Sequence, residues 1–534
     1  MKKINYKIQL LSLGLVLTMA ACNKKLDLVP TNDITAQTVY NTPAGYKQGL
    51  AKVYAAFALT GNTGGTGNPD ISPQIINDEG NSDFLRLYWN LQELTTDEAS
   101  WTWQNDAGVR GLHEMSWSAV NPIISGVYYR AFFQIALCND FIRQASDANL
   151  SSRGITGTSA DSIQHYKAEA RFIRAYQYWV LMDLFGNPPF ITEDDPVATG
   201  LPKQIQRKDL FDYIEKELKA IDADLLAPKA NEYGRADQAA AWALLARLYL
   251  NAEVYTGSPR YTDAITYSNK IVGSYTLHPN YRELMLADNN LNTDEFIFTI
   301  NYDGTHTQNW GGTTYLTHGP AAVPGSISGT SGNWGGLRCT QDFVNLFTDY
   351  TGNTDQRPQF YTSGQNLQMT DLYTGTDGFS VTKYRNLTRA GGPAADRDNA
   401  GNWVDIDFPL FRLGEIYLIY AESVLRGGTG GDLGTSLTYI NQLRTRAYGN
   451  ASGNITSAEL TTNFILDERA RELYYEAQRR TDLVRYGKFT TGAYLWAWKG
   501  GVAGGRSVDN KYNIYPIPST DLSSNPNLIQ NAGY

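Results

Sequence analysis

Two pairs of neighbouring acids are the first candidates for chemistry in this sequence. Asp78 precedes Glu79, and Asp97 precedes Glu98, in stretches rich in Asn, Ser and Thr. A glycosidase needs two carboxyl groups about 5 to 10 Å apart across the bond that it cleaves. Neighbouring positions do not establish that geometry. Solvated loop acids are therefore the favoured interpretation, and a glycoside hydrolase is the less favoured alternative.

Other catalytic and metal-binding motifs are missing from the sequence. The five histidines, at positions 113, 165, 278, 306 and 318, include no pair at helical metal-ligand spacing. There is no Gly-x-Ser-x-Gly elbow, Walker loop or Gly-x-Gly-x-x-Gly turn. These observations argue against hydrolase, nucleotide and zinc chemistry, and we expect no required cofactor.

One oxygen-rich loop is a candidate for a structural Ca²⁺ ion. The stretch "ADNNLNTDEF" places Asp288, Asn290, Asn292 and Asp294 at alternate positions. It lacks the central Gly and the closing Glu of an EF-hand loop. A turn in which the Asx side chains bond to their own backbone is the favoured interpretation, with a Ca²⁺ near Asp288 as the alternative.

Tryptophans in polar loops are a clearer signal. In "TTDEASWTWQND", Trp101 and Trp103 stand two apart, so an extended backbone would point both indoles to one face. Trp310 in "QNWGGTTY" and Trp334 in "SGNWGGLRC" are each preceded by Asn and followed by Gly-Gly, outside any apolar periodic run. We therefore expect Trp310 and Trp334 to be displayed for a ligand. For Trp101 and Trp103 the same display is one interpretation, and a cap on a hydrophobic surface is the alternative, because the Trp-x-Trp pattern recurs at Trp496 and Trp498 in "YLWAWKGG".

A carbohydrate suits such indoles best. A sugar ring has an apolar C–H face that stacks on an aromatic ring, and a rim of hydroxyls that needs hydrogen-bond donors and acceptors. Peptides also bind aromatic surfaces, so the pattern favours a glycan while a peptide stays an alternative.

Composition and charge exclude other partners. The chain has 534 residues, a net charge of -9 and a pI near 5.2, and no run of basic residues follows its first eight positions. Nucleic-acid binding requires clustered Lys and Arg, so we expect no nucleic-acid partner.

The N-terminus predicts export and a lipid anchor. A basic start, an apolar stretch and two alanines precede Cys22, which matches a bacterial lipobox. We expect residues 1–21 to be a lipoprotein signal peptide, Cys22 to be lipidated, and residues 22–40 to form a tether. An ordinary signal peptide with a chance cysteine is the alternative. For Cys138, in an apolar helix-like run, a buried thiol is favoured over a disulfide with Cys339.

Helical periodicity dominates the rest of the chain. Apolar residues recur at three- and four-residue spacing in residues 121–147, 162–185, 208–226, 236–252, 260–275, 408–428, 433–449 and 466–489. We expect a mainly α fold in which residues 41–534 form one domain. Tetratricopeptide-like helix pairs, mainly in 121–275 and 408–490, would scaffold loop-rich ligand-binding regions at about 60–115 and 277–405.

Long segments of the chain resemble one protein family, the SusD/RagB glycan-binding lipoproteins. The resemblance covers nearly the whole chain and is carried by Cys22 with "LDLVP" and by the stretches "AEARFIRAYQYWVLMDLFGNPPF", "GRADQAAAWALLARLYLNAEVYTG", "FPLFRLGEIYLIYAES", "ERARELYYEAQRRTDLVRYGKF" and "YPIPSTDLSSNPNLIQNAGY". The stretches "NDEGNSDFLRLYWNLQELTTDEASWTWQ" and "YLWAWKGG" look closest to the family's starch-binding prototype. The resemblance implies the SusD-like fold, with helix pairs behind a loop-rich glycan-binding face.

The resemblance also implies a set of binding residues. The aromatic arc of the prototype, which follows the curve of an α-glucan, falls on Trp103, Trp310 and Trp334, with Trp101 beside it. Its polar contacts fall on Asp78 and Arg86, and a further amide falls on Asp106 or, with a shift of one residue, on Asn105. Trp310 replaces a Tyr of the prototype.

The same resemblance implies a role and a location. The family's members bind glycans on the outer face of the outer membrane and deliver oligosaccharides to a SusC-like TonB-dependent β-barrel transporter. The prototype binds starch, which implies for this chain a non-catalytic role in binding starch or malto-oligosaccharides. We accordingly expect a lipid-anchored, surface-exposed protein of the outer membrane that binds an α-glucan. A different glycan or a peptide is the alternative ligand.

Overall fold

The computed structural model describes residues 36–61, 64–65, 67–72, 74–196 and 200–534. The predicted signal peptide, the lipidation site Cys22 and the tether up to residue 35 lie outside the described residues. Within the described part of the chain, no helix combines the length and the apolar character needed to cross a membrane.

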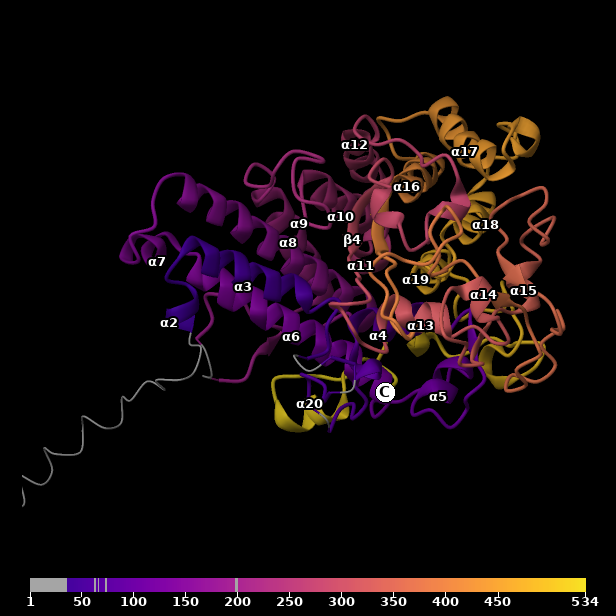
Figure 1. Cartoon of the computed structure of the whole chain (residues 1–534), viewed down its shortest axis with the longest axis horizontal. Helices are drawn as coiled ribbons and strands as arrows, with labels where there is room; N and C mark the ends of the chain where they lie inside the picture. Colours follow the sequence, from indigo (N-terminus) through magenta and orange to yellow (C-terminus); the bar gives the residue numbers. More distant parts are fainter. Residues whose placement is uncertain (1–35, 62–63, 66, 73, 197–199) are drawn as a thin grey trace, which may run out of the picture.

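Long helices that pack side by side form the first part of the domain. Helix α3 (Pro43–Ala55) contacts α6 (Pro122–Gln144) and α8 (Thr158–Phe185), and α8 also packs on α9 (Arg207–Ala220) (Figure 1). Helix α6 begins where the sequence predicts, because Oδ1 of Asn121 accepts the N–H groups of Ile123 and Ile124.

A second series of helices continues through the molecule (Figure 1). Helix α10 (Gln238–Leu250) packs on α12 (Tyr261–Val272), α12 on α16 (Leu413–Leu425), and α16 on both α17 (Leu433–Tyr448) and α18 (Thr462–Leu473). The mainly α fold is thereby confirmed. The tetratricopeptide-like character of the helix pairs stays a prediction.

Short elements complete the domain. The remaining α-helices are α2 (Ala36–Val39), α4 (Phe84–Glu93), α5 (Val109–His113), α7 (Asp147–Ser152), α11 (Ala252–Thr256), α13 (Gly312–His318), α14 (Gly325–Ser328), α15 (Gln341–Val344), α19 (Arg479–Arg485) and α20 (Ser519–Ser524). Within the described residues, the strands pair antiparallel as β1 (Ser100–Trp101) with β5 (Leu337–Arg338), β2 (Pro189–Phe190) with β3 (Lys203–Gln204), β4 (Phe296–Ile300) with β8 (Phe408–Arg412), and β6 (Phe360–Tyr361) with β7 (Ser380–Val381).

Three sequence predictions differ from the structure. Residues 408–412, predicted as helix, form strand β8, because a continuous apolar run carries no helical period and pairs with β4. The predicted helix 466–489 is interrupted between α18 and α19, where Tyr475 and Ala477 have φ of 63° and 60°. The loop-rich region 60–115 contains α4, whose residues are all buried.

Both downstream cysteines lie in the protein interior. Cys138 on α6 and Cys339 are buried and free. Burial raises the pKa of the Cys138 thiol to about 12. The predicted buried thiol at Cys138 is confirmed.

A buried cluster of charges joins the second helix series to the strands. Arg412 at the end of β8 is 1% exposed. Its guanidinium donates to Glu295 at 2.9 Å, to Glu472 at 2.7 Å and to Glu476 at 2.8 Å. Although burial acts to raise it, the guanidinium groups of Arg446 and Arg412 lower the pKa of the Glu472 carboxyl to about 2. Glu472 is therefore ionised, and the two guanidinium groups balance its charge.

We predict that Arg412→Met destabilises the fold strongly. Three buried carboxylates would lose a shared partner, and breaking a buried ion pair from one side costs about 3 to 5 kcal/mol. Denaturant unfolding should show a clearly lower midpoint for this variant. Lys47→Met, which removes an exposed partner of Glu232, should leave the midpoint nearly unchanged. Equal midpoints for wild type and Arg412→Met would contradict the account.

Candidate functional site

The residues that the resemblance selects line one cavity. It has a volume of about 580 Å³ and lies where residues 75–81, α4, the turn after β1, the start of α6, and the loops before α13 and β5 meet. All eight predicted binding residues line it, namely Asp78, Arg86, Trp101, Trp103, Asn105, Asp106, Trp310 and Trp334. The cavity therefore gathers side chains from segments that are more than 200 positions apart in the chain.

Short backbone contacts bring these segments together. Strand β1 pairs with β5, so that Trp101 stands opposite Leu337, and the N–H of Thr102 donates to the Gly336 carbonyl at 3.1 Å. This pairing sets Trp103 beside the loop of Trp334.

The loop of Trp310 is held from the start of α4. Oδ1 of the buried Asp83 accepts the N–H groups of Arg86 and Gly312, each at 2.8 Å. Nη1 of Arg86 donates to the Trp310 carbonyl at 2.9 Å. Asp83 and Arg86 therefore fix the backbone from the Trp310 carbonyl to Gly312, directly after this indole.

The Gly-Gly pairs after Trp310 and Trp334 allow close packing. A Cβ atom on Gly336 would lie 2.4 Å from Cζ3 of Trp101, and one on Gly311 would lie 2.1 Å from Cβ of Asp83. A side chain at Gly336 would therefore push the Trp334 loop away from Trp101, and one at Gly311 would push the Trp310 loop away from the start of α4.

The indoles form a continuous, tilted series of rings. The ring centroids of Trp103 and Trp101 are 4.9 Å apart, those of Trp101 and Tyr315 5.4 Å, and those of Tyr315 and Trp334 6.4 Å. Trp334 and Trp310 follow at 5.9 Å, with an angle of 61° between the ring planes. Successive ring planes are inclined to one another, by 74° for Trp103 and Trp101 and by 41° for Trp101 and Tyr315, so the rings do not form one flat surface.

The two tryptophans of the "WTW" stretch have different environments. Trp103 is 41% exposed, whereas Trp101 is 1% exposed. The Trp101 indole packs edge-to-face against Trp103, and its Nε1 donates to Oδ2 of Asp106 at 3.1 Å. The expectation that both indoles are displayed is therefore right for Trp103 and wrong for Trp101, which supports its neighbour from below.

Polar groups lie at the margin of the ring series. Asp78 and Asn105 are exposed, and Asp106 is half-buried, where burial raises the pKa of its carboxyl. The guanidinium of Arg86 lies 4.5 Å from the Tyr315 ring centroid, over that ring. The cavity thus combines flat apolar surfaces with carboxylate, amide and guanidinium groups.

Sequence reasoning missed two rings of this cluster. Tyr315 lines the cavity, and Trp403 packs on Trp310 with centroids 4.1 Å apart. A usable signal exists for Trp403, because "GNW" occurs both at residues 332–334 and at residues 401–403. Tyr315 lies in a short helix with no comparable signal.

The acid pairs have structural roles. Asp97 and Glu98 are buried, and Asp97 accepts Nε and Nη2 of Arg479 at 2.8 and 2.9 Å. Glu79 is buried as well, and Thr60 donates to it. The interpretation as solvated loop acids therefore holds only for Asp78.

An arginine side chain occupies the oxygen-rich loop. Nε of Arg389 lies 3.1 Å from Oδ2 of Asp288, and its Nη2 lies 3.0 Å from Oδ1 of Asn292. In the described ranges, no group of three or more His, Cys, Asp and Glu side chains is arranged to hold a metal ion. A Ca²⁺ near Asp288 stays a prediction that would require Arg389 to move.

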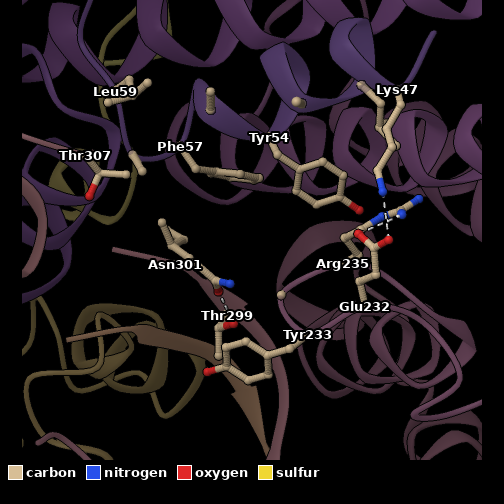
Figure 2. A pocket seen from close by; sticks show the side chains of 16 residues that line it. Lys47, Tyr54, Phe57, Leu59, Glu232, Tyr233, Arg235, Thr299, Asn301 and Thr307 are labelled. Atoms are coloured by element: carbon tan, nitrogen blue, oxygen red, sulfur yellow. Dashed lines mark hydrogen bonds and ion pairs between the residues drawn. The ribbon is translucent and has the colours of Figure 1, made fainter. Parts of the chain in front are cut away.

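A second cavity, of about 290 Å³, lies between α3 and the loop before α10 (Figure 2). The rings of Tyr54, Phe57 and Tyr233 line it, and Lys47 and Glu232 form an ion pair at one end. Its lining includes none of the eight predicted residues. Substitutions in this second cavity can therefore serve as controls for substitutions in the ring-lined cavity.

Comparison with known proteins places the fold and the family. The model of the SusD family matches residues 370–534, and a model described as "Starch-binding associating with outer membrane" matches residues 87–250. The chain is 35% identical to the starch-binding protein SusD of Bacteroides thetaiotaomicron over 100% of both chains. It is 23% identical to SusD-like protein P2 of Formosa agariphila, covering 78% of this chain and 81% of that one.

Solved structures share the architecture at lower identity. Surface glycan-binding protein A from Bacteroides fluxus aligns with a TM-score of 0.69 at 21% identity, over 92% of this chain and 100% of that chain. The protein of the same name from Bacteroides thetaiotaomicron, in complex with laminarihexaose, aligns with a TM-score of 0.68 at 19% identity, over 91% and 99%.

His113 contacts the backbone of Trp101 in the cavity wall, and we predict that it makes the stability of the protein depend on pH. Nε2 of His113 accepts the Trp101 N–H at 2.8 Å, and its Nδ1 lies 3.0 Å from the Leu94 carbonyl, an arrangement that suits a neutral ring. Burial lowers the pKa of His113 to about 4. As the pH falls from 6.5 to 4, the unfolded chain takes up this proton first, which costs up to about 3 kcal/mol of stability.

Denaturant unfolding at pH 6.5 and pH 4.5 tests this expectation. His113→Gln keeps one donor and one acceptor but does not titrate. The variant should therefore lose less stability than the wild type between the two pH values. An identical loss in both proteins would show that His113 carries none of the pH dependence.

Proposed function

The chain belongs to the SusD family, and from this membership together with the ring-lined cavity we propose that it is a non-catalytic binding protein for starch and malto-oligosaccharides. The observation that carries the proposal is the series of mutually inclined aromatic rings in the cavity. The 35% identity to a starch-binding relative over the full length of both chains supports the same ligand class.

The tilt of the rings favours an α-glucan among the glycans. A helical α-glucan turns successive sugar faces through an angle, whereas an extended, flat chain presents parallel faces. The planes of Trp310 and Trp334 meet at 61°, which suits the curved chain. Trp103, the most exposed ring of the set, would stack on one sugar face from the other end of the cavity.

Polar neighbours can serve the hydroxyl groups of the sugar. Asp78 offers carboxylate oxygens, Arg86 offers guanidinium N–H groups at the cavity wall, and Asn105 offers both a donor and an acceptor. Nε1 of Trp101 already donates to Asp106, so Asp106 has one oxygen fewer for a ligand. Asn105 is consequently the better candidate for the amide contact implied by the family resemblance.

The proposal includes a cellular setting. We place the protein at the outer membrane, anchored by lipid on Cys22 and exposed at the surface. There it would pass oligosaccharides to a SusC-like TonB-dependent transporter. The family model described as associating with the outer membrane supports this location. The predicted signal peptide and the predicted lipobox at Cys22 agree with it.

Two alternatives concern the ligand and the chemistry. Another glycan is the main alternative, since a protein of the same fold was solved with laminarihexaose, and a peptide is a further one. A glycoside hydrolase is less favoured. The acids among the residues that line the cavity are Asp78 and Asp106, and Asp106 already accepts a hydrogen bond from Trp101.

Calorimetry with maltoheptaose and a cyclodextrin tests the ligand class. An open cavity of this kind should bind with Kd on the order of 0.1 to 1 mM. Trp103→Ala, Trp310→Ala and Trp334→Ala should each weaken binding at least about tenfold, or about 1.4 kcal/mol, because each removes a stacking surface. The matched control is Tyr233→Ala, which removes a ring from the other cavity and should leave Kd unchanged. No heat with either sugar from the folded wild type would reject the starch proposal.

Chromatography of maltoheptaose incubated with the protein tests the absence of catalysis. We expect the sugar to remain intact after prolonged incubation. Release of shorter sugars that disappears in Asp78→Asn would contradict the binding-only role and support a hydrolase.

A further inference from the structure

Two buried histidines border the ring series and differ in their hydrogen-bond partners. His113 faces one acceptor, the Leu94 carbonyl, and one donor, the Trp101 N–H. A neutral imidazole, with one N–H and one lone pair, satisfies both. His113 therefore needs no charge.

His318, at the end of α13, faces two acceptors. Its Nδ1 lies 2.6 Å from the Gly332 carbonyl oxygen and its Nε2 lies 2.9 Å from the Asn402 carbonyl oxygen. A neutral ring has one N–H, so one of these contacts would oppose a nitrogen lone pair to an oxygen lone pair. The imidazolium form donates to both carbonyls.

The Gly332 and Asn402 carbonyls belong to the two loops that carry Trp334 and Trp403. Gly332 stands two residues before Trp334, whose ring stacks on His318 at 5.1 Å with an angle of 13°. The N–H of Trp334 donates to the His318 carbonyl at 2.7 Å. Asn402 directly precedes Trp403, the ring that packs on Trp310. His318 thus contacts the loop that carries Trp334 and the loop that carries Trp403, the ring behind Trp310.

The groups around His318 influence the pKa of its imidazole ring. Burial lowers its pKa below the usual 6.5, while the two carbonyl contacts and the carboxylate of Asp398 act in the opposite direction. Asp398 also accepts the N–H groups of Asn402 and Trp403 at 2.7 and 2.9 Å. The guanidinium of Arg86 is a further charged group near this cluster, 6.0 Å from the Trp334 ring centroid. The two carbonyl contacts and Asp398 therefore favour the imidazolium form, against the effect of burial.

We propose that His318 is a positioning residue of the ring-lined cavity, whose imidazolium form ties the Gly332 and Asn402 loops together and tightens ligand binding as the pH falls from 7.5 to 5.5. The ligand part of this inference rests on the proposed function. A sugar stacks best on rings that are held in place. It therefore favours the arrangement in which His318 donates to both carbonyls over any in which one of these contacts is broken.

Nitrogen-15 NMR of the ligand-free protein, labelled in its histidine side chains, tests the charge state directly. The chain has five histidines, so the His318 signals can be assigned by their loss in His318→Gln. At pH 5.5 both nitrogens of His318 should carry a proton, whereas His113 should carry one proton at pH 5.5 and at pH 7.5. A single protonated nitrogen on His318 at pH 5.5 would overturn the inference.

Maltoheptaose titrations at both pH values test the consequence. Wild type should bind roughly fivefold more tightly at pH 5.5 than at pH 7.5. His318→Phe keeps a flat ring to stack on Trp334 but has no N–H group, and its ratio should fall to about twofold or less. His165→Gln, on α8, should keep the wild-type ratio.

The comparison between wild type and His318→Phe isolates His318 from other groups near the cavity. Burial raises the pKa of Glu79 to about 7 and that of Asp83 to about 6, and both carboxyls are present in each variant. Equal ratios in wild type and His318→Phe would overturn the inference. Absence of binding by wild type at both pH values would reject the proposed ligand, and the NMR result would then decide the role of His318 alone.

Discussion

The buried guanidinium of Arg412 fixes the turn on which the ring-lined cavity depends. It holds Glu472, at the end of α18, and Glu476, inside the turn before α19. Between them Tyr475 adopts a φ of 63°, a conformation that costs energy for a residue with a side chain. The N–H of Tyr475 then donates to the carboxyl group of Glu98, two residues before β1, at 3.0 Å. Charge pairing far from the cavity therefore sets the position of the strand that leads to Trp103.

The cavity itself is built in two layers. Trp101, Tyr315 and Trp403 are almost fully buried and fill the inner layer, while Trp103, Trp310 and Trp334 lie over them and are partly exposed. Glycines and backbone hydrogen bonds bring the loops close enough for ring-to-ring contact. A ligand would meet rings that are already supported from behind, which limits the conformational entropy that binding must remove.

Helices were predictable from local pattern, whereas the cavity was not. The periodicity of residues 162–185 identified most of α8, and that of residues 121–147 identified α6. Local pattern failed at Phe408–Arg412, where strand pairing prevails, and at Tyr475, where buried charges override a helical period. The meeting of Trp103, Trp310 and Trp334 depends on contacts between distant segments. No spacing rule encodes those contacts, and the family resemblance supplied them. Burial of Trp101, Asp97 and Glu98 likewise depends on segments far along the chain.

A crystal structure of the protein soaked with maltoheptaose would test the central claim most directly. The account predicts sugar density along the ring-lined cavity, stacked on Trp103 at one end and on Trp310 and Trp334 at the other, with Asp78 or Arg86 within hydrogen-bond distance of hydroxyl groups. Density in the cavity lined by Tyr54 and Tyr233, with the ring-lined cavity empty, would contradict it.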